Sequence, residues 1–305
     1  MAQRSGMHLT ESHTEAVQFV YSIDSVLFQG VTPFQHVNIV EVPRFGKSLF
    51  LDHKIQSSQL DEFIFHESMV HPAMITHPEP KKVAIAGGGE GASLRDALRH
   101  KSVQAATMVD IDEKFVDIAK EHLPEWHQGS FQDPRSTLIY ADARRWLQSN
   151  TDKFDVILSD LTDPLEAGPA VYLFTKDFYS LAFDALNDDG ILAIQAGCAN
   201  NNSPYLFVSL IKTLREVFPF VRPYWAFVTT FLMPWGFILA SKKHDPLELS
   251  QSDIAHRLSE RGITNTRYYS PVMHHGMFAL PPYIEDGVKE YGRVLTDSDP
   301  FYWQT

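Results

Sequence analysis

Acidic side chains follow four successive β-rich runs in the middle of this sequence. They are Glu90, Asp110, Asp112, Asp142, Asp160 and Asp163. A single acid after a strand is commonly a helix N-cap. Four runs that all end in this way favour a shared site, because the carboxyl ends of parallel strands meet at one edge of a sheet, where such folds bind ligands. Clustered carboxylates there would attract a cationic ligand.

A glycine-rich turn, VAIAGGGEGA at 83–92, follows the first of these runs. Gly87, Gly89 and Ala92 match the dinucleotide fingerprint G-x-G-x-x-A. Asp110 lies about twenty residues downstream, where an acid binds ribose hydroxyls. The same pattern suits the loop of a nucleoside cofactor that carries no phosphate. The glycines therefore leave the class of cofactor open.

Glu90 separates these two classes of cofactor. A dinucleotide places its pyrophosphate on the free N–H groups of a helix N-terminus, and a carboxylate at that point would repel it. Glu90 would instead attract a sulfonium or an amine. An adenosine–sulfonium cofactor also gives roles to Asp110, at the ribose, and to Asp142 and Ala143, at the adenine.

The segment DLTDP at 160–164 supplies a second pair of carboxylates. Asp160 and Asp163 can bind an alkylammonium, and one of them can take a proton as the amine attacks. An amine with a pKa of about 10 is almost wholly protonated at neutral pH, so a transferase that uses it as a nucleophile needs such a base. Pro164 and Pro169 make the following loop irregular and suited to act as a lid.

Composition disfavours several other classes of function. The net charge of −12 argues against nucleic-acid binding, which depends on basic patches. No run of about 18 apolar residues is present to cross a membrane. His66 and His71 do not share a helix face, so no metal site is expected. A single cysteine, Cys198, suits a reducing compartment, and a cytoplasmic location is expected.

The elements that must position these residues can be predicted from the hydrophobic pattern of the chain. Residues 17–58 alternate with a period of two, which predicts a small antiparallel sheet. A helical pattern at 60–75 ends at the prolines of HPEP, 77–80. Beyond it, β-rich runs alternate with helical ones, which predicts a parallel sheet with helices on both faces. We therefore expect an α/β protein with an N-terminal β-domain and linking helix at 1–78 and a Rossmann-like catalytic domain at 79–305.

Recognisable motifs are spread along nearly the whole chain. They are IQSSQLDEFIFHE (55–67), GGGEG (87–91), VDID (109–112), DPR (133–135), DLTDP (160–164), IQAG (194–197), WGFILAS (235–241) and YYSPVMHHGMFALP (268–281). In combination they resemble the polyamine aminopropyltransferases, the spermidine synthase family, and among them most of all the thermospermine synthases. That resemblance implies a methyltransferase-like Rossmann domain beside the small N-terminal antiparallel β-domain.

The resemblance also implies a reaction, in which an aminopropyl group moves from decarboxylated S-adenosylmethionine to a polyamine. Spermidine is the favoured acceptor, with putrescine or agmatine as alternatives, and 5′-methylthioadenosine is the by-product. Decarboxylated S-adenosylmethionine would be a co-substrate, with no cofactor tightly bound, and the protein would form a homodimer or homotetramer.

Site residues follow from the same resemblance, with Asp160 as the catalytic base. The cofactor would be bound by Gln35, His66, Gly87, Gly89, Glu90, Asp110, Asp142 and Ala143, with Pro169 on the lid. The acceptor would be bound by Gln56, Phe65, Asp160, Asp163, Gln195 and Trp235.

Two departures from the family bear on the acceptor. Phe65 stands where the family usually has a tyrosine, whose hydroxyl helps to place the attacking amine. The stretch at 227–236, FVTTFLMPWG, lacks the proline- and tyrosine-containing loop typical of spermidine synthases. A putrescine acceptor is therefore less expected. Two alternatives stay open at this point: an S-adenosylmethionine-dependent amine N-methyltransferase, and a polyamine-binding protein without catalysis.

Overall fold

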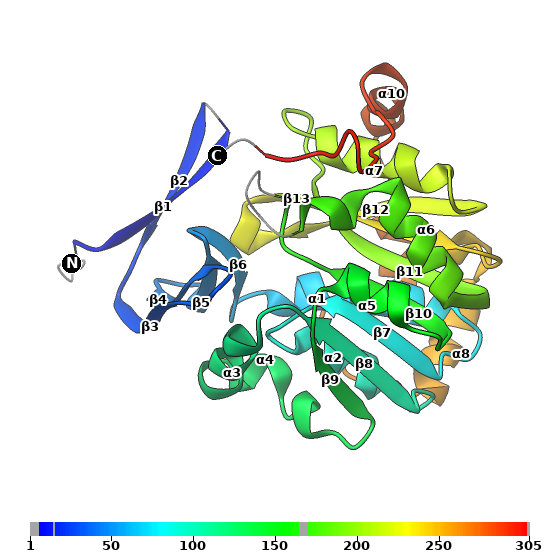
Figure 1. The fold of residues 1–305 in the computed structure, drawn as a ribbon, viewed down its shortest axis with the longest axis horizontal. Coiled ribbons are helices and arrows are strands. Elements are labelled where there is room, and N and C mark those ends of the chain that lie inside the picture. The colour runs from blue at the N-terminus through cyan, green and yellow to red at the C-terminus, as the bar shows by residue number, and fades with distance from the viewer. Residues whose placement is uncertain (1–5, 15, 165–169, 304–305) are drawn as a thin grey trace.

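The computed structural model describes residues 6–14, 16–164 and 170–303 (Figure 1). Its largest sheet has seven strands in the order β12-β13-β11-β10-β7-β8-β9. Neighbouring strands are parallel from β9 through to β11, and β13 pairs antiparallel with β11 and β12. The strands are β7 Lys82–Gly87, β8 Ala105–Asp110, β9 Ser136–Tyr140, β10 Phe154–Asp160, β11 Leu186–Cys198, β12 Phe220–Val228 and β13 Met233–Ser241. The predicted α/β class with a mostly parallel sheet is confirmed.

Helices cover both faces of this sheet, because its strands bury side chains alternately on each side. Val83 and Ile85 enter one core and Ala84 the other. The first core is shared with α1 (Glu62–Thr76), α2 (Ala92–Arg99), α8 (Gln251–Glu260) and α9 (Pro271–Met277). The second is shared with α5 (Ala143–Ser149), α6 (Lys176–Ala185), α7 (Tyr205–Arg215) and α10 (Pro282–Glu290). Within the described ranges, none of the helices combines the length and apolar character that crossing a membrane requires.

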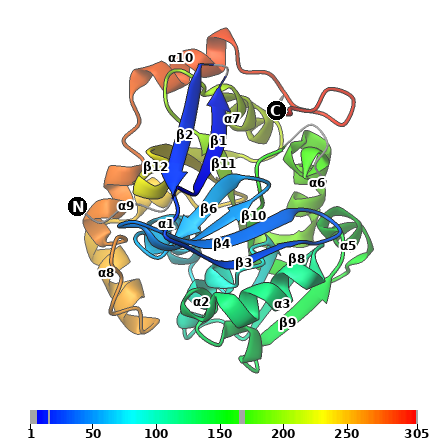
Figure 2. The same ribbon diagram turned by 90° about the vertical axis from the view of Figure 1, so that its left-hand side faces the viewer.

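The N-terminal region forms two antiparallel sheets rather than the single one expected (Figure 2). One is a hairpin of β1 (His8–Thr14) and β2 (Val17–Ser22), and the other contains β3 (Ser25–Val31), β4 (His36–Val42), β5 (Gly46–Leu51) and β6 (Lys54–Ser58). The sequence pattern missed β1 because its side chains are mostly polar and none is fully buried.

The four-stranded sheet packs against the helices that follow β8. Ile39 and Leu49 share a buried cluster with Phe115 of α3 (Glu113–His122) and Trp126 of α4 (Pro124–His127). The N-terminal region therefore sits over one end of the large sheet. The division of the chain after residue 78 stays a prediction.

The direction in which strands are added reverses between β7 and β10. From β7 the chain moves outward to β8 and β9, and then crosses back to β10 and β11 on the other side of β7. In open α/β sheets the loops on either side of such a reversal leave a crevice at the carboxyl ends of the strands. Glu90 follows β7 and Asp160 ends β10, so both lie at this crevice.

Gly91 and Gly129 both hold left-handed backbone conformations, but their surroundings differ. Gly91 has φ +81° at the start of α2, and Gly129 has φ +84° before the short 3-10 helix Ser130–Gln132. A Cβ at Gly91 would lie 2.5 Å from the Phe131 ring and 2.7 Å from His127 Cβ, whereas a Cβ at Gly129 would meet no atom within 4 Å.

We expect Gly91→Ala to lower the free energy of unfolding by about 2–5 kcal/mol, because overpacking adds about 1–3 kcal/mol to a backbone cost of about 1–2 kcal/mol. The control, Gly129→Ala, should lose only the backbone part. Urea denaturation measures both losses. Equal losses would show that Phe131 and His127 move aside without cost.

Candidate active site

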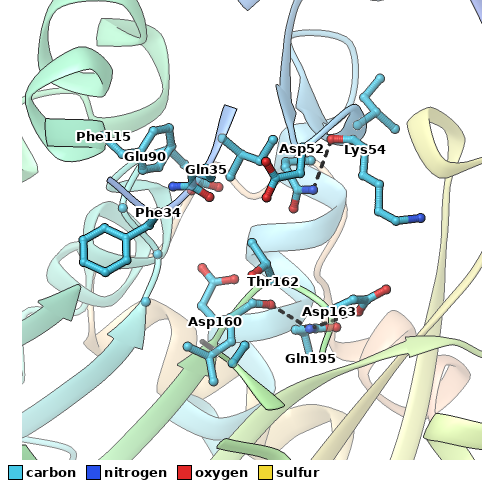
Figure 3. A pocket seen from close by; sticks show the side chains of 18 of the residues that line it. Phe34, Gln35, Asp52, Lys54, Glu90, Phe115, Asp160, Thr162, Asp163 and Gln195 are labelled. Atoms are coloured by element: carbon cyan, nitrogen blue, oxygen red, sulfur yellow. Dashed lines mark hydrogen bonds between the residues drawn. The ribbon is translucent and has the colours of Figure 1, made fainter. Parts of the chain in front are cut away.

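A cavity of about 890 Å³ opens between the N-terminal strands and the carboxyl ends of the large sheet. Pockets for small ligands typically have volumes of about 300–1,000 Å³, so this cavity has room for two small molecules together. Figure 3 shows Asp160 and Asp163 on one wall, facing Asp52 and Lys54 on another. The site-residue predictions that line it are Gln35, Gln56, Phe65, Gly87, Gly89, Glu90, Asp110, Asp142, Ala143, Asp160, Asp163, Gln195 and Trp235.

The glycine turn lies directly against the end of β10. The Gly88 N–H donates to the Asp160 carbonyl at 2.8 Å. Gly87 has φ +79°, and a Cβ on it would lie 2.2 Å from the same carbonyl oxygen. These glycines are therefore required for a close approach between two strand ends. That requirement holds whatever the cofactor, which explains why the glycine pattern could not identify it.

Asp160 accepts a side-chain hydrogen bond beneath the glycine turn. Ser93 Oγ, in α2, donates to Asp160 Oδ2 at 2.6 Å. Burial raises the pKa of Asp160 to about 6, with a further contribution from the negative charge of Glu90. A carboxylate with this pKa is ionised at neutral pH and is still basic enough to accept a proton.

Glu90 receives its support from a buried histidine. His66 Nε2 lies 3.1 Å from Glu90 Oε1, and His66 Nδ1 lies 2.9 Å from Glu62 Oε2. Burial alone would lower the pKa of His66, but its hydrogen bonds to Glu62 and Glu90 outweigh burial and raise the pKa to about 10. Arg95 pairs with Glu62 at 3.1 Å from the other side. His66 was expected among the cofactor contacts, but its side chain lies behind Glu90 and does not line the cavity.

The two acids after β8 have different surroundings. Asp110 lines the cavity, and burial raises its pKa to about 7. Asp112 does not line the cavity and caps α3 by accepting from the Phe115 N–H at 3.0 Å. Its other oxygen accepts from Thr32 Oγ1 at 2.5 Å and from Gln35 Nε2 at 3.0 Å. Asp112 thus ties the N-terminal region to the large sheet, and in doing so it orients Gln35.

Asp142 combines a structural contact with a place in the cavity. It accepts from the Arg145 N–H at 2.9 Å as the N-cap of α5, and it lines the cavity together with Ala143. The two interpretations of Asp142, as a helix cap and as a site residue, are therefore compatible in this structure.

The wall around Asp163 contains amide and aromatic side chains. Gln195 Nε2 donates to the Leu161 carbonyl at 2.7 Å and lies 3.4 Å from Asp163 Oδ1. Phe65 packs edge-on against Phe231, with ring centroids 6.1 Å apart. Because Phe65 is a phenylalanine, its side chain brings no hydroxyl to the wall. Trp235 lines the cavity nearby, whereas Pro169 lies outside the described residues.

Many other residues line the cavity and were not predicted to do so. They include the polar or aromatic side chains of Glu11, Tyr21, Lys54 and Trp303. Glu11 Oε2 accepts from the Ile55 N–H at 3.1 Å, and burial raises the pKa of Glu11. Among the described residues that line the cavity, Lys54 is the only lysine or arginine. The polar alternation of β1 conceals Glu11, and no local pattern could indicate that Trp303, near the C-terminus, returns to this site.

The arrangement of the acidic side chains bears on whether the cavity could bind a metal ion. Across the described part of the chain, no three His, Cys, Asp or Glu side chains come together in a group that could hold a metal ion. The carboxylates of the cavity are spread along its walls instead of converging on one point, which suits an extended cation with several charges.

Most of the chain matches known protein families and relatives in sequence. Residues 62–251 match the spermine/spermidine synthase domain, and residues 7–59 match the spermidine synthase tetramerisation domain. Polyamine aminopropyltransferase 2 of Hyperthermus butylicus is 39% identical over 303 residues, covering 99% of each chain. The polyamine aminopropyltransferase of Aeropyrum pernix is 44% identical over 280 residues, covering 90% of this chain and 88% of the relative.

Solved structures show the same relationship in three dimensions. A spermidine synthase in complex with the transition-state analogue AdoDATO superimposes with a TM-score of 0.88 at 31% identity, covering 95% of this chain and 97% of that one. The spermidine synthase of Thermotoga maritima gives a TM-score of 0.86 at 30% identity, with the same coverage. Sequence motifs, fold and site geometry agree, and the chain belongs to the spermine/spermidine synthase family of polyamine aminopropyltransferases.

Proposed function

We propose that this protein transfers the aminopropyl group of decarboxylated S-adenosylmethionine to a polyamine and releases 5′-methylthioadenosine. The observation that carries this proposal is the juxtaposition of Glu90 and Asp160, two carboxylates brought together by the contact of Gly88 with Asp160. One carboxylate is needed for the ammonium of the aminopropyl group and the other for the attacking amine. Membership of the aminopropyltransferase family supports the same reaction.

Each part of the cofactor has a matching group in the cavity. Glu90 binds the ammonium of the aminopropyl group, and His66 orients Glu90 from behind. Asp110 accepts from the ribose hydroxyls, and Gln35 lies on the same part of the wall. Asp142 and Ala143 contact the adenine. The cofactor is a co-substrate that leaves as 5′-methylthioadenosine, and the proposal includes no tightly bound group.

Asp160 is the base of the reaction. The acceptor ammonium loses one proton to a carboxylate oxygen of Asp160, and the freed lone pair forms a C–N bond to the aminopropyl carbon next to the sulfonium. The C–S bond breaks at the same time, and its electron pair remains on sulfur, which becomes the neutral thioether of 5′-methylthioadenosine. Asp163 and Gln195 hold the rest of the acceptor.

We propose spermidine as the preferred acceptor. Glu11 and Asp163 supply two carboxylates beyond Asp160, and a triamine has three charged nitrogens to pair with them. Burial raises the pKa of both Glu11 and Asp163, which is the electrostatic cost that a bound ammonium would relieve. Gln56, Phe65 and Trp235 line the same channel and would contact the methylene groups.

We further propose that the protein acts as a homodimer or homotetramer in the cytoplasm. Val20, Val26, Leu27 and Val31 are exposed apolar side chains on β2 and β3. They lie in the region that matches the tetramerisation domain, and a second copy of the chain would bury them.

Incubation with decarboxylated S-adenosylmethionine tests the reaction directly. With putrescine, spermidine and agmatine supplied separately, we expect 5′-methylthioadenosine to form and kcat/KM to be highest for spermidine. Mass spectrometry of the product identifies the amine that was extended. Asp160→Asn serves as the control and should lower kcat by about 100-fold or more, as expected for loss of a general base. Absence of 5′-methylthioadenosine with all three amines would remove the proposal.

Glu90→Gln should distinguish the contribution of the aminopropyl group to cofactor binding from that of the nucleoside. The substitution removes the negative charge that binds the aminopropyl ammonium, so we expect about tenfold weaker binding of decarboxylated S-adenosylmethionine, equivalent to roughly 1.4 kcal/mol. Binding of 5′-methylthioadenosine, which has no ammonium, should change little. Isothermal calorimetry with both ligands measures the difference. Equal losses would mean that Glu90 acts on the fold and not on the aminopropyl group.

The pH dependence of the reaction should follow Asp160. With the cofactor saturating, kcat/KM for the acceptor should fall as the pH drops through about 6 or below, because protonated Asp160 cannot accept a proton. Ser93→Ala removes the donor to the ionised carboxylate, which raises the pKa of Asp160 and should move the acidic limb upward by about one pH unit. Ser68→Ala is the control, since Ser68 is buried, does not line the cavity, and its hydroxyl donates to the Ile64 carbonyl within the same helix. An unshifted limb in Ser93→Ala would assign the titration to another group.

A further inference from the structure

The C-terminal segment 292–303 runs from α10 back across the molecule to the cavity. In Figure 1 this red trace leaves α10, passes close to α7 and runs toward the side of the molecule where the N-terminal strands lie. The two family domains matched by this chain cover residues 7–59 and 62–251, so the segment lies beyond both of them.

The middle of the segment is fixed to the helices it crosses. Leu295 is fully buried in the core formed with α6 and α7. Its N–H donates to Thr213 Oγ1 at 2.9 Å, and its carbonyl accepts from the Lys176 N–H at 2.7 Å. The bond to Thr213 is buried, and together with the backbone bond from Lys176 it gives the segment one defined path at this point.

A second anchor connects the segment to the part of the cavity proposed for adenine. Asp297 Oδ1 accepts from Arg144 Nη1 and from Thr175 Oγ1, each at 2.8 Å. Arg144 is the residue after Ala143 in α5. The Asp297 N–H donates to Asp177 Oδ2 at 3.0 Å. A bidentate arginine–carboxylate pair with additional hydrogen bonds is a rigid attachment.

The end of the segment reaches the loop that carries the acceptor carboxylate. The Trp303 N–H donates to the Pro164 carbonyl at 2.8 Å, one residue after Asp163. The Trp303 ring lines the cavity and packs edge-on against Phe301, with centroids 5.0 Å apart. Its indole Nε1 is buried and has no partner among the described residues. The contact thus joins the last described residue to the wall of the acceptor channel.

We propose that the segment 292–303 acts as a clamp that holds residues 160–164 in place, and that Trp303 is a positioning residue for the polyamine acceptor. This inference rests on the proposed function, because Asp163 is assigned to the acceptor there. The hydrogen bond to Pro164 restrains the position of the Asp163 carboxylate. The Trp303 ring adds a flat apolar wall, against which methylene groups and an ammonium can both pack favourably.

The clamp has two parts that can be removed separately. Trp303→Ala keeps the backbone N–H and loses the ring, whereas deletion of residues 303–305 removes both. Trp303→Phe keeps the backbone N–H and an aromatic wall. Tyr302→Ala is the matched control, because Tyr302 is exposed and does not line the cavity.

Steady-state kinetics should show that loss of the Trp303 ring weakens binding of the acceptor. We expect Trp303→Ala to raise KM for spermidine about tenfold, as loss of roughly 1.4 kcal/mol of contact would do. The deletion should raise KM for spermidine further. In Trp303→Phe this KM should return most of the way to the wild-type value, and in Tyr302→Ala it should equal that value. The dissociation constant of 5′-methylthioadenosine should stay within about twofold in all four variants. A parallel loss of 5′-methylthioadenosine binding, or an unchanged KM in Trp303→Ala, would overturn the proposal.

Hydrogen exchange of peptides covering residues 160–164 provides a readout that does not depend on turnover. The deletion should speed exchange of these amides at least tenfold, while Tyr302→Ala should not. Unchanged exchange in the deletion would refute the clamp even if the enzyme is active. Faster exchange in a protein that produces no 5′-methylthioadenosine would uphold the clamp and count against the proposed reaction.

Discussion

The site depends on one close approach between backbones, at the point where the direction of strand addition reverses. Gly87 and Gly88 bring the turn after β7 onto the Asp160 carbonyl, so closely that a Cβ on Gly87 would occupy the space of the oxygen. This contact fixes the distance between the loop that carries Glu90 and the strand that carries Asp160. A side chain at Gly87 would separate the two carboxylates, and a cofactor and an amine could then no longer be held in contact.

The same approach creates an electrostatic cost that the surrounding residues only partly offset. Glu90, Asp110 and Asp160 all line the cavity, and burial raises the pKa of Asp110 and Asp160. On the side away from the cavity, Glu90 is balanced by His66, whose own charge is stabilised by Glu62. Asp160 accepts a hydrogen bond from the neutral hydroxyl of Ser93, and within the described ranges it has no ion-pair partner of this kind. The free site is therefore poised to bind cations, because a bound ammonium replaces the missing counter-charge.

Both ends of the chain complete the part of the cavity farther from the glycine turn. The β1–β2 hairpin contributes Glu11 and Tyr21, and the C-terminal segment contributes Trp303. The large sheet supplies the groups proposed for the nucleoside and the reaction, whereas the terminal segments shape the region proposed for the acceptor.

Much of the reaction centre could be predicted from the sequence, since its residues are defined by local patterns. A strand ends, an acid follows, and the parallel arrangement brings the strand ends together, so Glu90, Asp110, Asp142 and Asp160 could be assigned to one edge from their spacing alone. The charge of Glu90 was also sufficient to choose between cofactor classes. The tertiary structure decided what depends on contacts distant in the chain. It separated Asp110 from Asp112, put His66 behind Glu90, and brought Glu11, Lys54 and Trp303 into the cavity. The hydrophobic periodicity of the sequence cannot indicate these contacts, because each contact joins two segments that are distant in the chain and leaves the local pattern of both unchanged.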